Sequence, residues 1–149
     1  MALWSMRTPD QVKRDFVDQW LAKANQDLFS ASILLKGEPV SLEAAAFHAQ
    51  QAVEKFMKAF LVRHQVEFPK THNIAMLKTL IEKVDGKLAG QLARMETLTA
   101  YGVEYRYPGV YDPVSKKQGE EALDLANQAH DLILALLGPY LKEKPGGGK

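Results

Sequence analysis

The chain contains no cysteine, which excludes disulfides, thiolate nucleophiles and zinc sites built on cysteine. Its formal net charge is only +1 at pH 7, so no overall excess of basic residues indicates nucleic acid. The longest apolar run, Leu132 to Leu137, is far shorter than the roughly 20 residues of a membrane helix, and the N-terminal MALWSMRTPD lacks an apolar run of signal-peptide length. These absences predict a soluble cytoplasmic protein that does not span a membrane.

The length and composition fit one globular domain. The 149 residues are 46% hydrophobic and 25% charged, proportions typical of a protein that buries a single core. We predict a flexible leader over residues 1–8, a helical domain over residues 9–141 and a disordered tail over residues 142–149, because the tail is polar and rich in glycine.

The segment from Ser41 to His64 is the most informative part of the chain. It has neither glycine nor proline, and its apolar residues recur at steps of three and four, which predicts one buried stripe on a helix. Alanines at positions 45, 49, 52 and 59 are small enough for another helix to approach closely. The predicted stripe consists of Leu42, Ala45, Ala46, Ala49, Val53, Phe56, Met57 and Phe60.

The same segment carries an ordered polar flank. His48, Gln51 and Lys55 follow one another at i, i+3 and i+7, and Glu54 and Lys58 form an i, i+4 pair beside them. This flank offers hydrogen-bond donors and acceptors to a polar ligand in a groove. The alternative is a solvated helix face with one ion pair.

A first helix is predicted before this segment. Thr8 and Pro9 supply an N-cap and a first-turn proline, and Gly37 is a plausible stop. The short connection to Ser41, the predicted N-cap of the next helix, favours an antiparallel helix pair. The apolar stripe predicted for the first helix is Phe16, Trp20, Ala24, Leu28, Ala31 and Leu35.

Asp27 is a charged residue that lies close to the predicted apolar stripe of the first helix. It should point inward or along the seam with a neighbouring helix, and a carboxylate there needs a cation or donors. Its partner is a lysine or arginine of a neighbouring helix, or Arg106 of a later loop, or else Asp27 contacts a ligand directly.

Two shorter helices are predicted after Pro69. The first is capped by Thr71 or Asn73 and stops around residues 85 and 86, and residues 87–101 indicate the second, weakened by Gly90.

A loop and a long final helix complete the domain. Residues 101–115 combine tyrosines, prolines and glycines, which predicts a loop. Ser115 and Gln118 form a capping box for a last helix that Gly138 and Pro139 end or kink. Since no strand-like alternation extends over more than a few residues, the fold class is all-α, with four to five helices.

Beside the His48 flank, the turn of Lys70, Thr71 and His72 is a second polar cluster. It opens a helix, where free backbone N–H groups and the helix dipole favour an anion. The alternative is an ordinary N-cap with a surface lysine.

The third polar cluster is the loop of Tyr105, Arg106 and Tyr107. An arginine between aromatic rings is suited to stacking on a base and pairing with phosphate. Equally, the tyrosines pack on the helices and Arg106 neutralises Asp27.

Familiar catalytic and metal-binding motifs are missing. The four histidines, at positions 48, 64, 72 and 130, do not have the close spacing of a metal site. Walker, dinucleotide-binding and nucleophile-elbow patterns are absent as well, and the terminal GGGK precedes no helix. We therefore predict neither a metal ion nor a cofactor.

Taken together, these clusters resemble the HEPN-domain family, a group of nucleotide-binding domains. The resemblance lies in FHAQQAVEKFMKAFL at 47–61, EFPKTHNIAML at 67–77 and YRYP at 105–108. It runs from about Trp20 to Leu137 and includes the pattern of Trp20, Ala24, Asp27, Leu28 and Ala31.

The resemblance implies an up-and-down helical bundle, usually a homodimer, that associates with nucleotides or RNA. Such domains often occur beside a minimal nucleotidyltransferase in a toxin–antitoxin or stress module. Many are metal-independent ribonucleases whose motif is an arginine followed four to six residues later by a histidine. Here no histidine follows Arg106 in that window. Tyr111 stands where the histidine would, but a phenol titrates near 10 and is a poor base at neutral pH.

Three hypotheses follow. In the favoured one, the chain binds a nucleotide or RNA without strong catalysis and works with a nucleotidyltransferase. Phosphate then faces Lys55, Lys58, Lys70 and Arg106, while His48, Gln51 and the tyrosines contact base or sugar. Thr71 and His72 complete the predicted nucleotide-binding residues. In the second, a ribonuclease toxin combines Arg106 with a non-adjacent histidine such as His48 or His72. In the third, the chain is a non-catalytic dimerisation scaffold.

Overall fold

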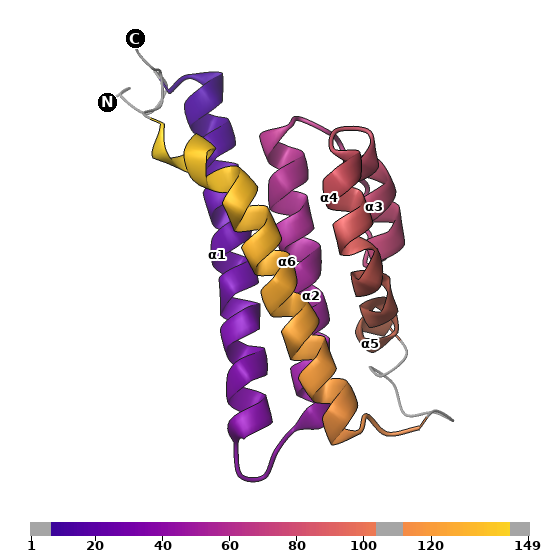
Figure 1. The fold of residues 1–149 in the computed structure, drawn as a ribbon. Coiled ribbons are helices and arrows are strands. Elements are labelled where there is room, and N and C mark those ends of the chain that lie inside the picture. Colours follow the sequence, from indigo (N-terminus) through magenta and orange to yellow (C-terminus); the bar gives the residue numbers. More distant parts are fainter. Residues whose placement is uncertain (1–6, 104–111, 144–149) are drawn as a thin grey trace.

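The computed structural model describes residues 7–103 and 112–143, and these form helices and their connections without any strand. Three long helices and a group of short ones lie side by side (Figure 1). The predicted all-α class is confirmed. The helices are α1 (Pro9–Lys36), α2 (Leu42–Arg63), α3 (Ile74–Glu82), α4 (Gly86–Leu92), the 3₁₀ helix η2 (Ala93–Leu98), α5 (Thr99–Val103) and α6 (Lys116–Lys142).

Helix α2 is the centre of the bundle and contacts α1, α6, α3, α5 and η2. Its predicted apolar stripe is buried apart from Leu42, which is half-buried. The alanines at 45, 49, 52 and 59 are also buried, so neighbouring helices do approach closely there. Ser41 occupies the N-cap position as predicted, although its side chain makes no capping hydrogen bond.

The limits of α1 are as predicted, and its buried face is predicted in part. Thr8 and Gln11 form a capping box with Pro9 in the first turn, and Gly37 is the C-cap. Phe16, placed in the buried stripe by the sequence analysis, is 52% exposed. Ala24 and Ala31 of the predicted stripe are buried, and Trp20 and Leu28 are partly buried against the core. The buried face also includes Val17 and Leu21, which the prediction left out. Phe16 and Ala24 are eight residues apart, so the predicted stripe drifts off the face that meets α2.

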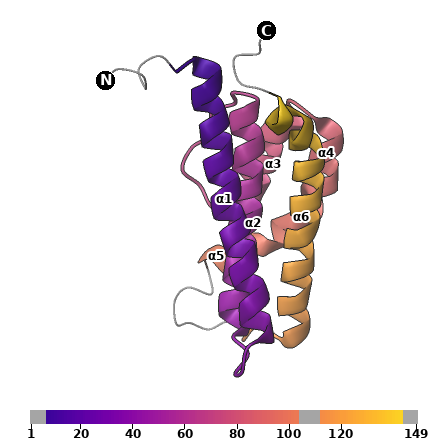
Figure 2. The same ribbon diagram turned by 90° about the vertical axis from the view of Figure 1, so that its left-hand side faces the viewer.

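The region after α2 differs from the prediction in its boundaries. Asn73 caps α3, which ends at Glu82 rather than at residues 85 and 86, because Asp85 caps a separate helix, α4. The single helix predicted over residues 87–101 is divided between α4, η2 and α5. Figure 1 shows these short helices on one side of α2. Figure 2, turned by 90°, shows the long helices α1, α2 and α6 running side by side.

The final helix begins as predicted and continues further. Ser115 and Gln118 form the capping box, but α6 runs through Gly138 and Pro139 to Lys142. Tyr140, in that last turn, is only 4% exposed. Its burial against the other long helices is the physical reason that the helix does not stop at the proline.

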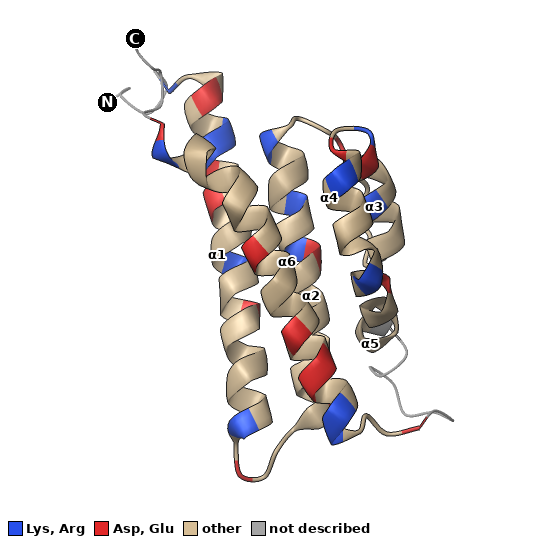
Figure 3. Cartoon of the chain, in the orientation of Figure 1, with Lys and Arg blue, Asp and Glu red and all other residues tan. Residues whose placement is uncertain are grey.

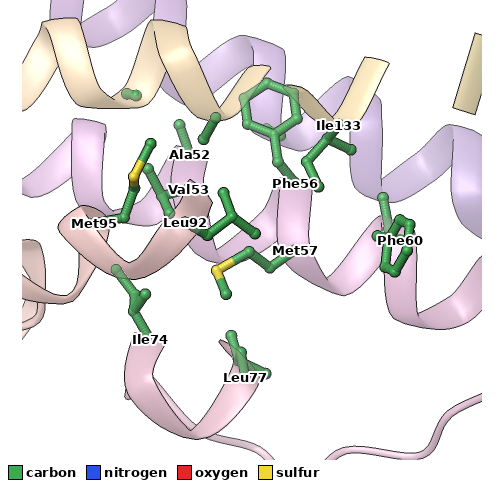
Figure 4. Packing of buried hydrophobic residues seen from close by; sticks show 14 of the residues in the cluster. Ala52, Val53, Phe56, Met57, Phe60, Ile74, Leu77, Leu92, Met95 and Ile133 are labelled. Carbon is green, nitrogen blue, oxygen red and sulfur yellow. The ribbon is translucent and has the colours of Figure 1, made fainter. Parts of the chain in front are cut away.

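The core joins the long helices to the short ones. Figure 4 shows Met57 of α2 facing residues of α3 and α4, and Phe56 beside Ile133 of α6. The largest fully buried side chains come from every element except α1 and α5. Among the described residues, no helix is long and apolar enough to cross a membrane.

Candidate functional site

Two histidines are each held by a carboxylate next to α2. The Nδ1 atom of His48 lies 2.8 Å from Oδ1 of Asp27 on α1, and the other Asp27 oxygen accepts a hydrogen bond from Lys55 Nζ. Asp27 therefore lies at the seam between helices and pairs with a lysine of the neighbouring helix, as one of the sequence interpretations required. Its side chain is 13% exposed, against 33% for His48 and 23% for Lys55.

The second carboxylate is more deeply buried. Glu54, with a side chain only 2% exposed, has its Oε1 atom 3.0 Å from Nδ1 of His72 and 3.8 Å from Nζ of Lys58. The expected Glu54–Lys58 pair exists, but it is buried and not on a solvated face. His72, in the connection between α2 and α3, keeps half of its side chain exposed.

Burial dominates the electrostatics of this pair. Desolvation raises the pKa of Glu54, although His72, Lys58 and Lys55 each act to lower it. Desolvation likewise lowers the pKa of Lys58, with Glu54 opposing it. The Glu54 carboxylate and the Lys58 ammonium thus stabilise each other at a buried position where either charge alone would be costly.

The lysine Lys58 is enclosed by the connection and by α1. Its Nζ donates to the Thr71 carbonyl oxygen at 3.2 Å and lies 5.3 Å and 5.7 Å from the ring centroids of Trp20 and Phe68. Those two rings pack edge to face. Lys58 therefore fastens the connection to the bundle, and its ammonium group is already coordinated by protein.

Gln50 links the cluster to α5. It is fully buried, donates weakly to the His72 carbonyl oxygen at 3.5 Å and accepts a hydrogen bond from Gln51 Nε2 at 3.0 Å. A Cβ atom on Gly102 would lie 2.5 Å from the Gln50 amide oxygen, so a larger residue at this position would require the Gln50 side chain to move. The chain therefore leaves α5, at Val103, beside the polar cluster.

The start of α3 agrees with the ordinary-cap interpretation. Asn73 Oδ1 accepts from Met76 N, Thr71 Oγ1 accepts from Asn73 N, and Ile74 N donates to Thr99 Oγ1. These bonds occupy most of the N–H groups that an anion would use. Lys70 remains exposed beside them.

The structure thus brings part of the predicted site together. We call the group of Asp27, His48, Gln50, Gln51, Glu54, Lys55, Lys58 and His72 the polar cluster. Lys70 and Thr71 adjoin it through the same connection. Tyr105, Arg106, Tyr107 and Tyr111 lie outside the described residues.

The polar cluster is suited to proton transfer and hydrogen bonding. Within the described ranges, no group of three or more histidine, aspartate or glutamate side chains is placed to hold a metal ion. A carboxylate on Nδ1 fixes the orientation of each histidine and leaves its Nε2 atom for another partner. Each histidine can therefore donate or accept a hydrogen bond through its Nε2 atom.

Comparison with known proteins identifies the family. A model of the HEPN domain matches residues 17–136 of the chain, which is most of its length. The chain belongs to the HEPN-domain family.

A similar protein comes from an archaeon. The HEPN chain is 27% identical over 138 residues to a protein of Methanocaldococcus jannaschii named "Putative toxin MJ1304", a match that covers 85% of this chain and 89% of that protein. No solved structure matches the chain.

Sequence reasoning missed three parts of this HEPN protein's cluster. Gln50 was not singled out in the sequence, yet it is the residue that reaches α5. Trp20 and Phe68 were not connected with Lys58, because they are 38 and 10 residues away from it in the sequence. The available signal was the glycine at position 102, which marks a close backbone approach inside a helix.

Proposed function

We propose that this HEPN-domain protein is the toxin-like member of a two-protein module, and that it binds a nucleotide or RNA at the polar cluster. Its partner in this proposal is a minimal nucleotidyltransferase, and it acts as a homodimer in the cytoplasm. Membership of the HEPN family and the name of the archaeal relative support the toxin-like role.

One observation carries the binding site. His48 and His72 are each anchored through Nδ1 and remain 33% and 51% exposed, on elements that flank the partly exposed Lys55. A scaffold that needed only stability would gain little from two oriented, accessible imidazoles. In our proposal His48, Gln51 and Lys55 contact the ligand from α2, and Lys70, Thr71 and His72 contact it from the connection.

Charge balance assigns different roles to the cations. Asp27 offsets Lys55, and Glu54 offsets Lys58, so the described cluster has little net charge when both histidines are neutral. The net attraction for phosphate then comes from Lys70 and Arg106, and Lys55 adds one charge-assisted contact. Lys58 supports the site from beneath, and Tyr105 and Tyr107 stack on a base.

Isothermal titration with ATP, GTP and a short RNA tests the proposal. We expect binding by the wild-type chain and a loss of roughly tenfold in affinity for Lys55→Gln, the equivalent of about 1.4 kcal/mol, because a charge-assisted contact is removed. Lys87→Gln is the matched control, since Lys87 is an exposed lysine of α4 away from the cluster.

The opposite result is equally clear. If none of the three ligands produces heat at protein concentrations near a millimolar, or if Lys55→Gln and Arg106→Ala bind as well as the wild type, the polar cluster is not a nucleotide site. The dimerisation-scaffold hypothesis predicts that outcome.

A metal-independent ribonuclease is the second candidate, favoured by the two carboxylate–histidine pairs. Such pairs supply an oriented base and acid for attack of a ribose 2′-hydroxyl on the adjacent phosphate. In this candidate Arg106 stabilises the charge on the phosphate. Tyr111 occupies the sequence position where the family's ribonuclease motif has a histidine.

Cleavage of a labelled RNA in EDTA distinguishes the two candidates. A ribonuclease should lose at least tenfold in rate in each of His48→Ala, His72→Ala and Arg106→Ala, because each removes a group that acts on the reacting phosphate. His130→Ala is the control, since His130 lies on α6 and pairs with Asp131. Cleavage that is absent in the wild type, or unchanged in these variants, excludes this mechanism.

A further inference from the structure

The outward side of α1 carries a regular seam that the other described residues leave largely exposed. Its residues follow one another at steps of three and four, the spacing at which helices pair in coiled coils. We call this set the α1 seam: Val12, Asp15, Gln19, Ala22, Gln26, Phe29 and Ile33.

Exposure confirms that the seam faces away from the bundle. Val12 is 41% exposed, Phe29 66% and Ile33 53%. At 100° per residue the seam lies opposite the buried face of α1, along Leu21 and Ala24. Large apolar side chains exposed in such a row indicate an interaction surface.

The seam is also poor in charge. From Gln19 to Ile33 none of its members is charged, and residues 28–35 of α1 contain no Lys, Arg, Asp or Glu. Figure 3 shows the lower half of α1 as mostly tan, the colour of uncharged residues. A helix face that only meets water normally carries charged residues.

We propose that a second copy of the chain covers the α1 seam, with the two α1 helices antiparallel and a twofold axis close to Gln26. This inference rests on the homodimer of the proposed function and specifies its surface. It requires the seam to be complementary to itself.

Self-complementarity follows from the order of residues about Gln26. Gln19 and Ile33 are each seven residues from it, so an antiparallel pair places one opposite the other. Ala22 and Phe29, four and three residues away, become neighbours, which sets a large ring on a small side chain. The two Gln26 amides meet at the axis, where polar seam residues fix register.

Charges at the ends of the seam match in the same arrangement. Asp15 is eleven residues before Gln26 and Lys36 is ten residues after it, so the carboxylate of one copy lies near the ammonium of the other. Asp15 contacts Arg7 in its own chain but is still 44% exposed. A parallel pair would instead place like charges together.

The natural lack of cysteine makes a direct test possible. Gln26→Cys should form a disulfide-linked dimer under mild oxidation, because two cysteines at the axis face each other. Met76→Cys is the matched control: Met76 is 44% exposed, on α3 and not on the seam. In parallel, sedimentation should show a wild-type dimer and at least a tenfold weaker dimer for Phe29→Asp, with Ile33→Asp as a second variant and circular dichroism as the check on folding.

The inference stands only if Gln26→Cys cross-links in preference to Met76→Cys and a folded seam variant dissociates more readily. A wild-type monomer at about 100 μM, a dimer indifferent to both seam variants, or equal cross-linking at the two sites overturns it. The cross-linking and sedimentation experiments contain no nucleotide, so a failed nucleotide titration does not change their result. A failed dimer test, in turn, does not argue against a nucleotide site at the polar cluster.

Discussion

Replacing Lys58 with methionine is expected to lower the free energy of unfolding by about 3 kcal/mol at pH 7, because it leaves a buried carboxylate without its lysine. Glu54 is 2% exposed, and Lys58 is the ammonium group that lies 3.8 Å from it. Methionine nearly preserves the side-chain volume beneath Trp20 and Phe68, so the loss reports the charge rather than a cavity. Urea unfolding followed by circular dichroism measures it.

An exposed ion pair provides the control for this substitution. Lys78 contacts Glu96 at 2.8 Å, but the two side chains are 27% and 35% exposed. Lys78→Met should therefore cost at most about 1 kcal/mol. Equal losses in the two variants would show that burial does not set the strength of the Glu54 pair.

The loss in Lys58→Met should also depend on pH. Burial already raises the pKa of Glu54 in the folded state above its usual 4.5. The folded protein therefore holds that proton more tightly, and stability falls as pH rises from 4.5 through the folded pKa. Removing Lys58 raises that pKa further, so the difference between variant and wild type should be smaller at pH 5 than at pH 8. A difference that does not change with pH would contradict this account.

Replacing Tyr140 with alanine is expected to lower the free energy of unfolding by about 3 to 5 kcal/mol, the usual cost of removing a buried aromatic ring. The Tyr140 ring has the guanidinium groups of Arg14 and Arg63 each 4.1 Å from its centroid. Arg14 also donates to the Tyr140 carbonyl oxygen. Through these contacts the last turn of α6 is fastened to α1 and α2. Thermal and urea unfolding measure the loss.

Tyr140→Phe separates the ring from its hydroxyl. Among the described residues, the Tyr140 hydroxyl is buried and lacks a hydrogen-bond partner, and burial raises its pKa. Removing this hydroxyl should change stability by less than about 1 kcal/mol, and in the stabilising direction, because no bond is lost and a desolvated polar group disappears. A large loss in Tyr140→Phe would mean that the hydroxyl is hydrogen-bonded after all.

The polar cluster shows how far spacing in a sequence can specify a site. The i, i+3, i+7 order of His48, Gln51 and Lys55 correctly predicted that these residues share a flank of one helix. It could not show that Lys55 is neutralised by Asp27, because that pair spans 28 residues. The same limit applies to His72, which reaches Glu54 only once the connection folds back on α2.

The caps and the central stripe were determined by the sequence alone. A capping box is complete within four residues, so Thr8 with Gln11 and Ser115 with Gln118 fix where α1 and α6 begin. The stripe of α2 is equally local, because a helix period places its apolar residues on one side whatever they pack against. These features needed no knowledge of neighbouring elements.

Tertiary structure alone decided which apolar side chains of the long helices are buried and which charged side chains form pairs. Phe16 fits a helical stripe yet stays exposed, whereas Tyr140 lies beyond a proline and is buried. Burial depends on how long helices cross, and the pairing of Glu54 with His72 and Lys58 depends on where a connection returns. A sequence period describes one helix at a time, so contacts between elements distant in the chain arise only when the bundle assembles.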